Sequence, residues 1–153
     1  MQQLKILKRK EVKQLLAKIK EQWGYSKSLD YAFLRSSKDK IYIVNKDFAK
    51  IDISKLKIDK IGLYFCTVVN KNEIRLSIEG SQIVGPYATK NIIELSRSEM
   101  KEWLQGVNIE KDVREIGGFA IIKYDSDFMG TGKVKEGKIL NYIPKARRIK
   151  ISL

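Results

Sequence analysis

The sequence predicts an α+β fold in which an N-terminal α/β region, residues 1–86, is followed by a small β-rich region, residues 87–153. Three observations lead to this prediction. An amphipathic helical pattern opens the N-terminal region, and strand-like apolar runs follow it. The pair Gly85-Pro86 then interrupts the chain. Beyond it, six of the ten glycines fall between residues 106 and 137, among short apolar runs typical of a small β-barrel or sandwich.

The first predicted element is a helix over residues 8–23. Its apolar side chains recur at helical spacing and form one stripe, which consists of Val12, Leu15, Leu16, Ile19 and Trp23. Gly24 follows at the position where a left-handed glycine ends many helices. Two strands are predicted next, at Leu29–Arg35 and Lys40–Val44, with a polar turn at Ser36–Asp39 between them and short helical turns within residues 45–58.

The rest of the N-terminal region predicts a hairpin and a short helix. The run Ile61–Val69 is almost wholly apolar, and the polar residues 70–72 separate it from a second strand at Glu73–Ser77. A short helix is predicted over Ile78–Val84. Cys66 lies within the most apolar strand, so we expect a core residue rather than a nucleophile.

The C-terminal region predicts a strand, a capped helix and four further strands. Asn91–Leu95 is the first strand, and Ser96 with Glu99 three residues later forms a capping box at the start of a helix that Gly106 closes. The further strands are predicted at Phe119–Tyr124, Phe128–Val134, Lys138–Ile143 and Arg148–Leu153.

Composition excludes several classes of chemistry. The 153 residues include 31 Lys and Arg against 18 Asp and Glu, a net charge of +13, with one cysteine and no histidine. A Cys/His metal cluster, a Ser–His or Cys–His catalytic couple and an internal disulfide are therefore excluded. No apolar run is long enough to cross a membrane, and the residues after Met1 lack the apolar core of a signal peptide. We expect a cytoplasmic protein without a membrane partner.

The positive charge is concentrated at the two ends of the chain. Residues 1–60 carry a net charge of +9, residues 61–132 carry −2 and residues 133–153 carry +6. Asn141 and Tyr142 lie among the C-terminal basic side chains, and Glu136 is the one acidic residue there. Lys and Arg neutralise phosphates and a tyrosine stacks on an unpaired base, so this pattern favours RNA. The alternative is a solubilising lysine-rich surface.

Two motifs suggest catalysis but have simpler structural interpretations. Gly130-Thr131-Gly132-Lys133 resembles a phosphate loop, yet position 127 is not glycine and Val134 follows the lysine. We expect these glycines to let a strand approach its neighbour. Asp125 and Asp127 form a carboxylate pair, but they occupy a predicted hairpin turn where aspartate is ordinary.

The cluster Lys145-Ala146-Arg147-Arg148 after Pro144 is the sharpest local feature. If Arg148 and Lys150 alternate with apolar residues along the last strand, one face of that strand is basic and the other is buried. Two or three cationic groups on one face bind phosphates. The alternative is an edge strand whose charged side chains keep it soluble and prevent it from pairing with another sheet.

The C-terminal segments resemble a known RNA-binding family. They are Glu102–Gly106, Gly118–Tyr124, Met129–Lys133 and Leu140–Arg148. Together they resemble a PUA-like domain, and more narrowly the domain at the C-terminus of NOL/sun-type RNA cytosine-5 methyltransferases. The segments Ile61–Phe65, Ile74–Ile78 and Gly85–Ala88 resemble the Nip-seven ribosome-biogenesis factors, in which an α/β pre-PUA domain precedes a PUA domain.

The resemblance implies non-catalytic binding of structured RNA, either rRNA or tRNA, by a pre-PUA domain and a PUA-like pseudobarrel. The implied partners are RNA and either an RNA methyltransferase or a pre-ribosomal particle; no cofactor is implied. The methyltransferase body has no counterpart in these segments, so we expect no enzymatic activity. The predicted RNA contacts are Lys90, Gly106, Lys133, Lys138, Asn141, Tyr142, Lys145, Arg147, Arg148 and Lys150.

Two other hypotheses stay open at this point. The basic ends could dock an acidic protein partner, with RNA binding incidental. An enzyme could instead use Glu115, Asp125 or Asp127, which predicts a concave pocket around those carboxylates.

Overall fold

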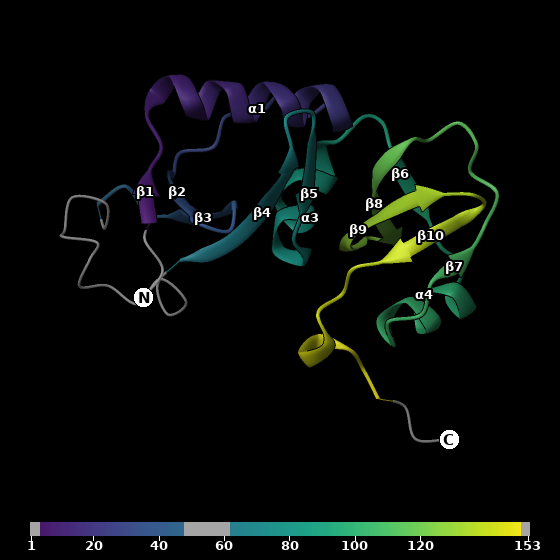
Figure 1. Cartoon of the computed structure of the whole chain (residues 1–153). Coiled ribbons are helices and arrows are strands. Elements are labelled where there is room, and N and C mark those ends of the chain that lie inside the picture. The colour runs from purple at the N-terminus through teal and green to yellow at the C-terminus, as the bar shows by residue number, and fades with distance from the viewer. Residues whose placement is uncertain (1–3, 48–61, 151–153) are drawn as a thin grey trace.

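A computed structural model describes residues 4–47 and 62–150, and its fold is α+β with two five-stranded sheets. Figure 1 shows the sheets side by side, with helix α1 lying across the first. The first sheet has the order β1-β2-β3-β4-β5 and is antiparallel throughout. Its strands are β1 (Leu4–Ile6), β2 (Ala32–Ser36), β3 (Lys40–Val44), β4 (Leu63–Asn70) and β5 (Glu73–Leu76).

Helix α1 (Arg9–Trp23) confirms the amphipathic pattern. Leu15, Ile19 and Trp23 are buried along one stripe of this helix. Gly24 ends the helix in the left-handed conformation with φ of 69°, and its N–H donates to the Lys20 carbonyl at 2.7 Å. None of the described helices combines the length and the apolar character needed to span a membrane.

The predicted hairpins of the first sheet are present. Strands β2 and β3 pair around the turn after Ser36, whose Oγ accepts hydrogen bonds from two backbone N–H groups of that turn. Strand β2 begins at Ala32, three residues later than predicted. Strand β1 was not predicted because three residues are too short to show a period of two. Most of the helical turns predicted within residues 45–58 lie outside the described residues.

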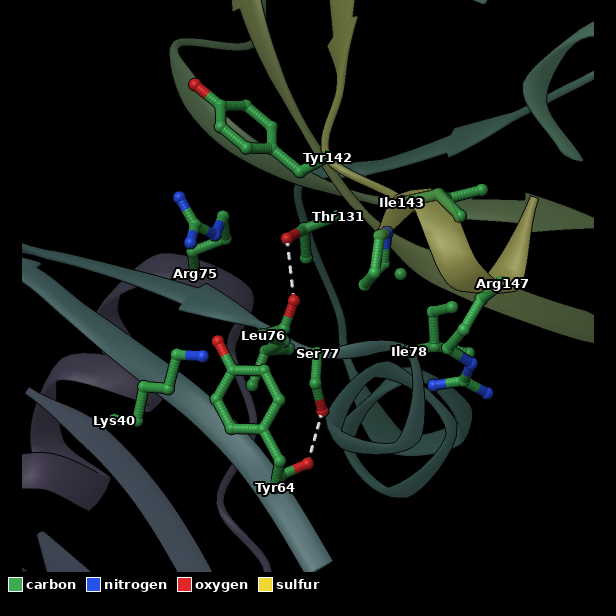
Figure 2. A pocket seen from close by; sticks show the side chains of 12 residues that line it. Lys40, Tyr64, Arg75, Leu76, Ser77, Ile78, Thr131, Tyr142, Ile143 and Arg147 are labelled. Atoms are coloured by element: carbon green, nitrogen blue, oxygen red, sulfur yellow. Dashed lines mark hydrogen bonds between the residues drawn. The ribbon is translucent and has the colours of Figure 1, made fainter. Parts of the chain in front are cut away.

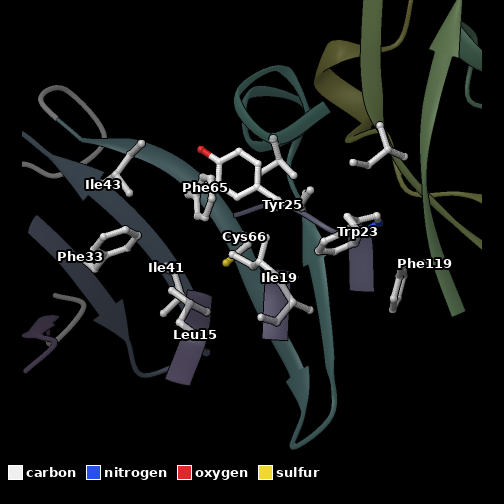
Figure 3. Close-up of a cluster of buried hydrophobic side chains, with 14 of the residues drawn as sticks. Leu15, Ile19, Trp23, Tyr25, Phe33, Ile41, Ile43, Phe65, Cys66 and Phe119 are labelled. Atoms are coloured by element: carbon white, nitrogen blue, oxygen red, sulfur yellow. The ribbon is translucent and has the colours of Figure 1, made fainter. Parts of the chain in front are cut away.

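Both sheets contribute to the main hydrophobic core. Figure 3 shows this cluster, in which Phe119 of the second sheet lies beside Trp23 of helix α1. Cys66 is fully buried within the cluster, and burial raises the pKa of its thiol, as expected for a core residue. Because Phe119 and Ile121 belong to this core, the two sheets are packed against each other. The boundary at residue 86 stays a prediction.

Helix α3 (Ile78–Val84) has the predicted bounds and connects the two sheets. The Ser77 hydroxyl accepts the Gly80 N–H at its N-terminus. From the next turn, Ser81 Oγ accepts the N–H of Gly130 at 2.8 Å. Thr131 Oγ1 donates to the Leu76 carbonyl at 3.0 Å. These buried bonds fix the helix and the end of β5 against the second sheet.

The second sheet has the order β6-β8-β9-β10-β7 and curls into a PUA-like pseudobarrel. Its strands are β6 (Ile92–Glu94), β7 (Ile109–Glu110), β8 (Gly118–Tyr124), β9 (Asp127–Lys135) and β10 (Lys138–Asn141). Strands β6 and β8 are parallel and the other pairs are antiparallel. Four predicted strands are therefore present, and the two-residue β7 was not predicted.

The Gly130–Lys133 segment lies inside β9, which confirms the strand interpretation over a phosphate loop. A β-carbon at Gly132 would lie 2.5 Å from Ile139 Cγ2 and 2.7 Å from the ring of Trp103. The glycine thus lets the Trp103 ring of helix α4 (Arg97–Leu104) pack directly on the strand. The indole N–H donates to the Met129 carbonyl at 2.9 Å.

The predicted strand Arg148–Leu153 is wrong over its described part. Residues Lys145–Arg147 form the 3-10 helix η4, and no strand follows through residue 150. The backbone N–H of Ile149 donates to the Leu104 carbonyl at 2.8 Å, so this segment caps helix α4 instead of pairing with a strand. Ile149 is 49% exposed, and the predicted alternation of a basic and a buried face is absent there. Residues 151–153 lie outside the described part of the chain.

Helix α4 has the predicted capping box. Glu99 N–H donates to Ser96 Oγ, and Ser96 N–H donates to Glu99 Oε1 at 2.8 Å. Partial burial works to raise the pKa of the Glu99 carboxyl, but the bonds from Ser96 and the Lys111 ammonium outweigh it, and the net pKa lies below its ordinary value.

Replacing Glu99 with Gln is expected to remove a pH-dependent part of the stability. Because the folded pKa is lowered, the ionised carboxylate stabilises the fold above the unfolded pKa, and this contribution disappears as pH falls through the folded value. Glu99→Gln should lower the free energy of unfolding by about 1 kcal/mol at pH 7. Urea titrations at pH 7 and pH 3 measure this; equal losses at both pH values would contradict the argument.

Candidate nucleic-acid interface

The segment after β10 is held against helix α4 by the amide of Asn141. Its Nδ2 donates to the carbonyls of Trp103 at 2.8 Å and Val107 at 3.0 Å, and its Oδ1 accepts the Ile143 N–H at 2.8 Å. This local bond ends β10 at Asn141, two residues earlier than predicted. The structure thus gives Asn141 an anchoring role, and its contact with RNA stays a prediction.

Gly106 and Arg148, both predicted site residues, lie against each other. Gly106 has φ of 90°, and a β-carbon there would lie 2.4 Å from Cδ and Nε of Arg148. Arg148 Nε donates to the Ile143 carbonyl at 3.0 Å. The glycine therefore makes room for an arginine that folds back onto its own segment, and Arg148 is half-buried.

Replacing Gly106 with Ala is expected to destabilise this segment. The substitution forces an L side chain into the left-handed region and displaces Arg148, a cost of about 1–2 kcal/mol. Gly137→Ala is the matched control, since Gly137 has φ of 75° but no atom within 4 Å of a β-carbon there. Trypsin should cleave after Arg147 and Arg148 faster in the Gly106 variant alone. Equal cleavage in both variants would contradict the packing role.

Arg147 ties η4 to helix α3. Its Nη1 lies 2.5 Å from Glu79 Oε1, and its side chain is still 46% exposed. Lys145, at the start of η4, and Lys150, three residues after Arg147 in the chain, are both exposed. Among the predicted residues, Tyr142, Lys145, Arg147 and Lys150 therefore form an accessible group around η4.

Lys133, Lys138 and Lys90 occupy other positions. Lys133 lies over the ring of Phe119 and 3.9 Å from Glu73. Lys138 begins β10, four residues before Tyr142, which is about 13 Å of extended chain at about 3.3 Å per residue. The N–H of Lys90 donates to the Trp23 carbonyl, which places this residue at the C-terminal end of helix α1. Lys90, Lys133 and Lys138 therefore lie apart from the group of predicted contact residues around η4.

A groove lies between the first sheet and the segment after β10, and its volume is about 150 Å³ (Figure 2). Lys40 of β3, Tyr64 of β4 and Arg75 of β5 contribute side chains from the first sheet. Tyr142 and Arg147 contribute side chains from the other side. The remaining lining residues are Leu76, Ser77, Ile78, Gly130, Thr131, Ile143 and Pro144.

Each tyrosine of the groove has a cation over its ring. The guanidinium of Arg75 lies 4.7 Å from the ring centroid of Tyr142, and the ammonium of Lys40 lies 5.3 Å from that of Tyr64. Phe119 meets the Tyr142 ring in an edge-to-face contact at 5.6 Å. These contacts hold the two rings and the two cations in defined positions at the groove.

The groove carries an excess of positive charge. Within residues 4–47 and 62–150, Arg147 is the groove cation with a carboxylate partner, Glu79. No ion pair in the same ranges involves Lys40 or Arg75. Two cations without a carboxylate partner, set beside accessible aromatic rings, suit a ligand that combines an anion with a planar ring.

Sequence reasoning missed Lys40, Tyr64 and Arg75. A signal for Arg75 was present, since its neighbours Ile74 and Leu76 are buried and the alternation of β5 turns Arg75 to the opposite face. Nothing in the sequence showed that this face would meet Tyr142, because the two residues are 67 positions apart and the contact depends on how the sheets pack.

The carboxylates considered for catalysis are exposed to solvent. Asp125 and Asp127 lie at the β8–β9 turn, as predicted, and Asp125 has φ of 52°. Glu115 is exposed as well, and none of the three lines the groove. Across the described residues, no three Cys, Asp or Glu side chains gather in a way that could hold a metal ion.

Comparison with known proteins identifies the C-terminal part of the chain. A family model described as the PUA domain of methyltransferase RsmF matches residues 90–149. The chain is 25% identical over 107 residues to ribosomal RNA small subunit methyltransferase F of Aeromonas salmonicida, a match that covers 70% of this chain and 22% of the relative. The same-named protein of Vibrio campbellii is 28% identical over 98 residues, 61% of this chain and 20% of the relative.

The chain spans about a fifth of the length of the curated relatives it matches. The longer matches extend beyond residues 90–149, because 107 residues exceed the length of that segment. The segment contains the Trp103–Gly132 packing, the Asn141 anchor and the Gly106–Arg148 contact described above. Residues 90–149 therefore form a PUA-like domain of the RNA cytosine methyltransferase type.

Proposed function

We propose that this protein binds structured RNA, rRNA or tRNA, without catalysing a reaction on it. The observation that carries the proposal is the groove, in which three cationic side chains and two tyrosines converge beside a PUA-like domain. Phosphate oxygens are neutralised by Lys and Arg, and unpaired bases stack on tyrosine. We propose that Lys145 and Lys150, exposed cations close to Arg147 in the sequence, also contact phosphates of the RNA.

The proposed biological setting is rRNA processing or RNA modification in the cytoplasm. The relatives are named as ribosomal RNA small subunit methyltransferases, and this chain matches about a fifth of each. We propose that it supplies RNA recognition to a separate modification enzyme or to a pre-ribosomal particle. The solvent-exposed positions of Asp125, Asp127 and Glu115 support a non-catalytic role, because a working acid–base pair is usually enclosed.

A gel-shift assay with a tRNA and a small-subunit rRNA fragment tests the proposal. The triple variant Lys145→Gln, Arg147→Gln, Lys150→Gln removes three exposed cations of the η4 group and leaves the packed Arg148 in place. Lys10→Gln, Lys13→Gln, Lys20→Gln on helix α1 is the control with the same loss of charge. We expect a clearly larger loss of affinity in the η4 variant and a steep dependence on salt.

The competing adaptor hypothesis predicts other results. Association with a protein partner that survives nuclease treatment, together with undetectable RNA binding at low salt, would replace RNA with an acidic protein as the ligand. Equal losses in the η4 and α1 variants would show that bulk charge, and not this surface, determines binding.

A further inference from the structure

We infer that the groove holds a single unpaired pyrimidine nucleotide of the bound RNA, with its base against the tyrosines and its phosphate near Lys40 and Arg75. The inference deepens the proposed function and rests on it. It assigns a ligand to the groove between the N-terminal sheet and the segment after β10, whereas the RNA contacts predicted from the sequence all lie between residues 90 and 150.

The size of the groove sets the first limit. A cavity of about 150 Å³ accommodates one six-membered ring such as benzene. A pyrimidine base has one such ring, whereas a purine adds a fused five-membered ring and a base pair is larger again. The groove therefore fits an unstacked pyrimidine base better than it fits a purine or a base pair.

The walls provide surfaces for the face of a base. Tyr142 is 40% exposed, and its ring is fixed from the side by Phe119. Tyr64 lines the groove from β4, and its hydroxyl is hydrogen-bonded to the Thr67 hydroxyl. Figure 2 shows the rings of Tyr142 and Tyr64 on opposite sides of the groove, and the Arg75 side chain at a height between the two rings. Rings held in this way stack on a base at little entropic cost.

The charges provide a place for the phosphate. Lys40 and Arg75 come from neighbouring parts of the first sheet, and in the described part of the chain neither has a carboxylate partner. Each of the two cations lies over a tyrosine ring, and each can also donate N–H groups to a phosphate. The guanidinium of Arg75 offers five N–H donors, which suits the phosphate oxygens and the carbonyl oxygens of a pyrimidine.

An unpaired nucleotide is the form of RNA that this groove can accept. In an A-form helix the bases are stacked inside and their faces are covered, so proteins that read bases use loops, bulges and ends. A bulged nucleotide turns out of the helix at low cost because it has no pairing partner. The flanking helix would then lie along the exposed cations of the η4 group.

Fluorescence anisotropy with fluorescein-labelled RNA hairpins tests the inference. The hairpins share one sequence and differ in a single bulged nucleotide, which is U, C, A, G or absent. The intact protein should bind the U and C bulges about tenfold more tightly than the A and G bulges or the hairpin without a bulge. Arg75→Gln and Tyr142→Ala should each remove this preference and leave the weaker binding to the unbulged hairpin.

Tyr87→Ala is the matched control, because Tyr87 also carries a cation, Lys27 at 5.0 Å from its ring, but lies outside the groove. This variant should keep the preference, and circular dichroism verifies that each variant is folded. Equal affinity of the intact protein for all five hairpins would overturn the inference and leave RNA binding intact. Binding to none of them would overturn the proposed function as well.

Discussion

Replacing Trp103 with Ala should lower the free energy of unfolding by about 3–5 kcal/mol. The ring is fully buried at the centre of the PUA-like domain, and it packs on Gly132 with no room for a β-carbon between them. Its N–H donates to the Met129 carbonyl, which would lose its partner in the variant. The cost combines the lost burial, the cavity and the unpaired carbonyl.

Urea denaturation followed by far-ultraviolet circular dichroism measures this change without relying on tryptophan emission. Gly132→Ala provides an independent check, because its β-carbon would enter the same contact from the strand side and should cost about 1–3 kcal/mol. Val107→Ala, at a side chain that is 45% exposed, is the control and should change little. A loss below 1 kcal/mol for Trp103→Ala would show that the ring is not the centre of this core.

The sequence predicted the elements whose signal is local. The apolar stripe that ends at Trp23 predicted helix α1, and the capping box of Ser96 and Glu99 predicted helix α4. The fold class followed from the order of these elements, whereas the PUA-like character rested on the resemblance of segments such as Met129–Lys133 to that family. For the two helices the cause lies within a few residues of the chain, where periodicity and capping act.

The features that were missed depend on partners distant in the sequence. The segment Arg148–Lys150 has the sequence alternation of a strand. Instead, the Leu104 carbonyl accepts a hydrogen bond from the Ile149 N–H, and the Arg148 side chain packs against Gly106. Similarly, the groove requires Arg75 to meet Tyr142, which local patterns do not encode. Tertiary contacts override local propensity at both places.

The double variant Lys40→Gln, Arg75→Gln should weaken binding of a hairpin with a bulged U by at least about tenfold at low salt. These two side chains are the groove cations without a carboxylate partner in the described part of the chain, so they are free to neutralise phosphate. If each contacts one phosphate, the slope of log affinity against log salt should become shallower by about 1.4, or about 0.7 per phosphate of a single strand. Filter binding from 50 to 300 mM salt, about the range over which such slopes are resolved, measures both quantities.

Two further variants make this result specific to the groove. Lys10→Gln, Lys13→Gln removes the same charge from the exposed face of helix α1, so a similar slope change there would mean that the effect is one of net charge. Glu79→Gln should act in the opposite direction, because it releases Arg147 from its ion pair and adds a third free cation to the groove. Affinity should then rise and the salt dependence should become steeper. A groove that binds phosphate predicts this pair of opposite shifts, whereas a surface that only solubilises the protein predicts neither.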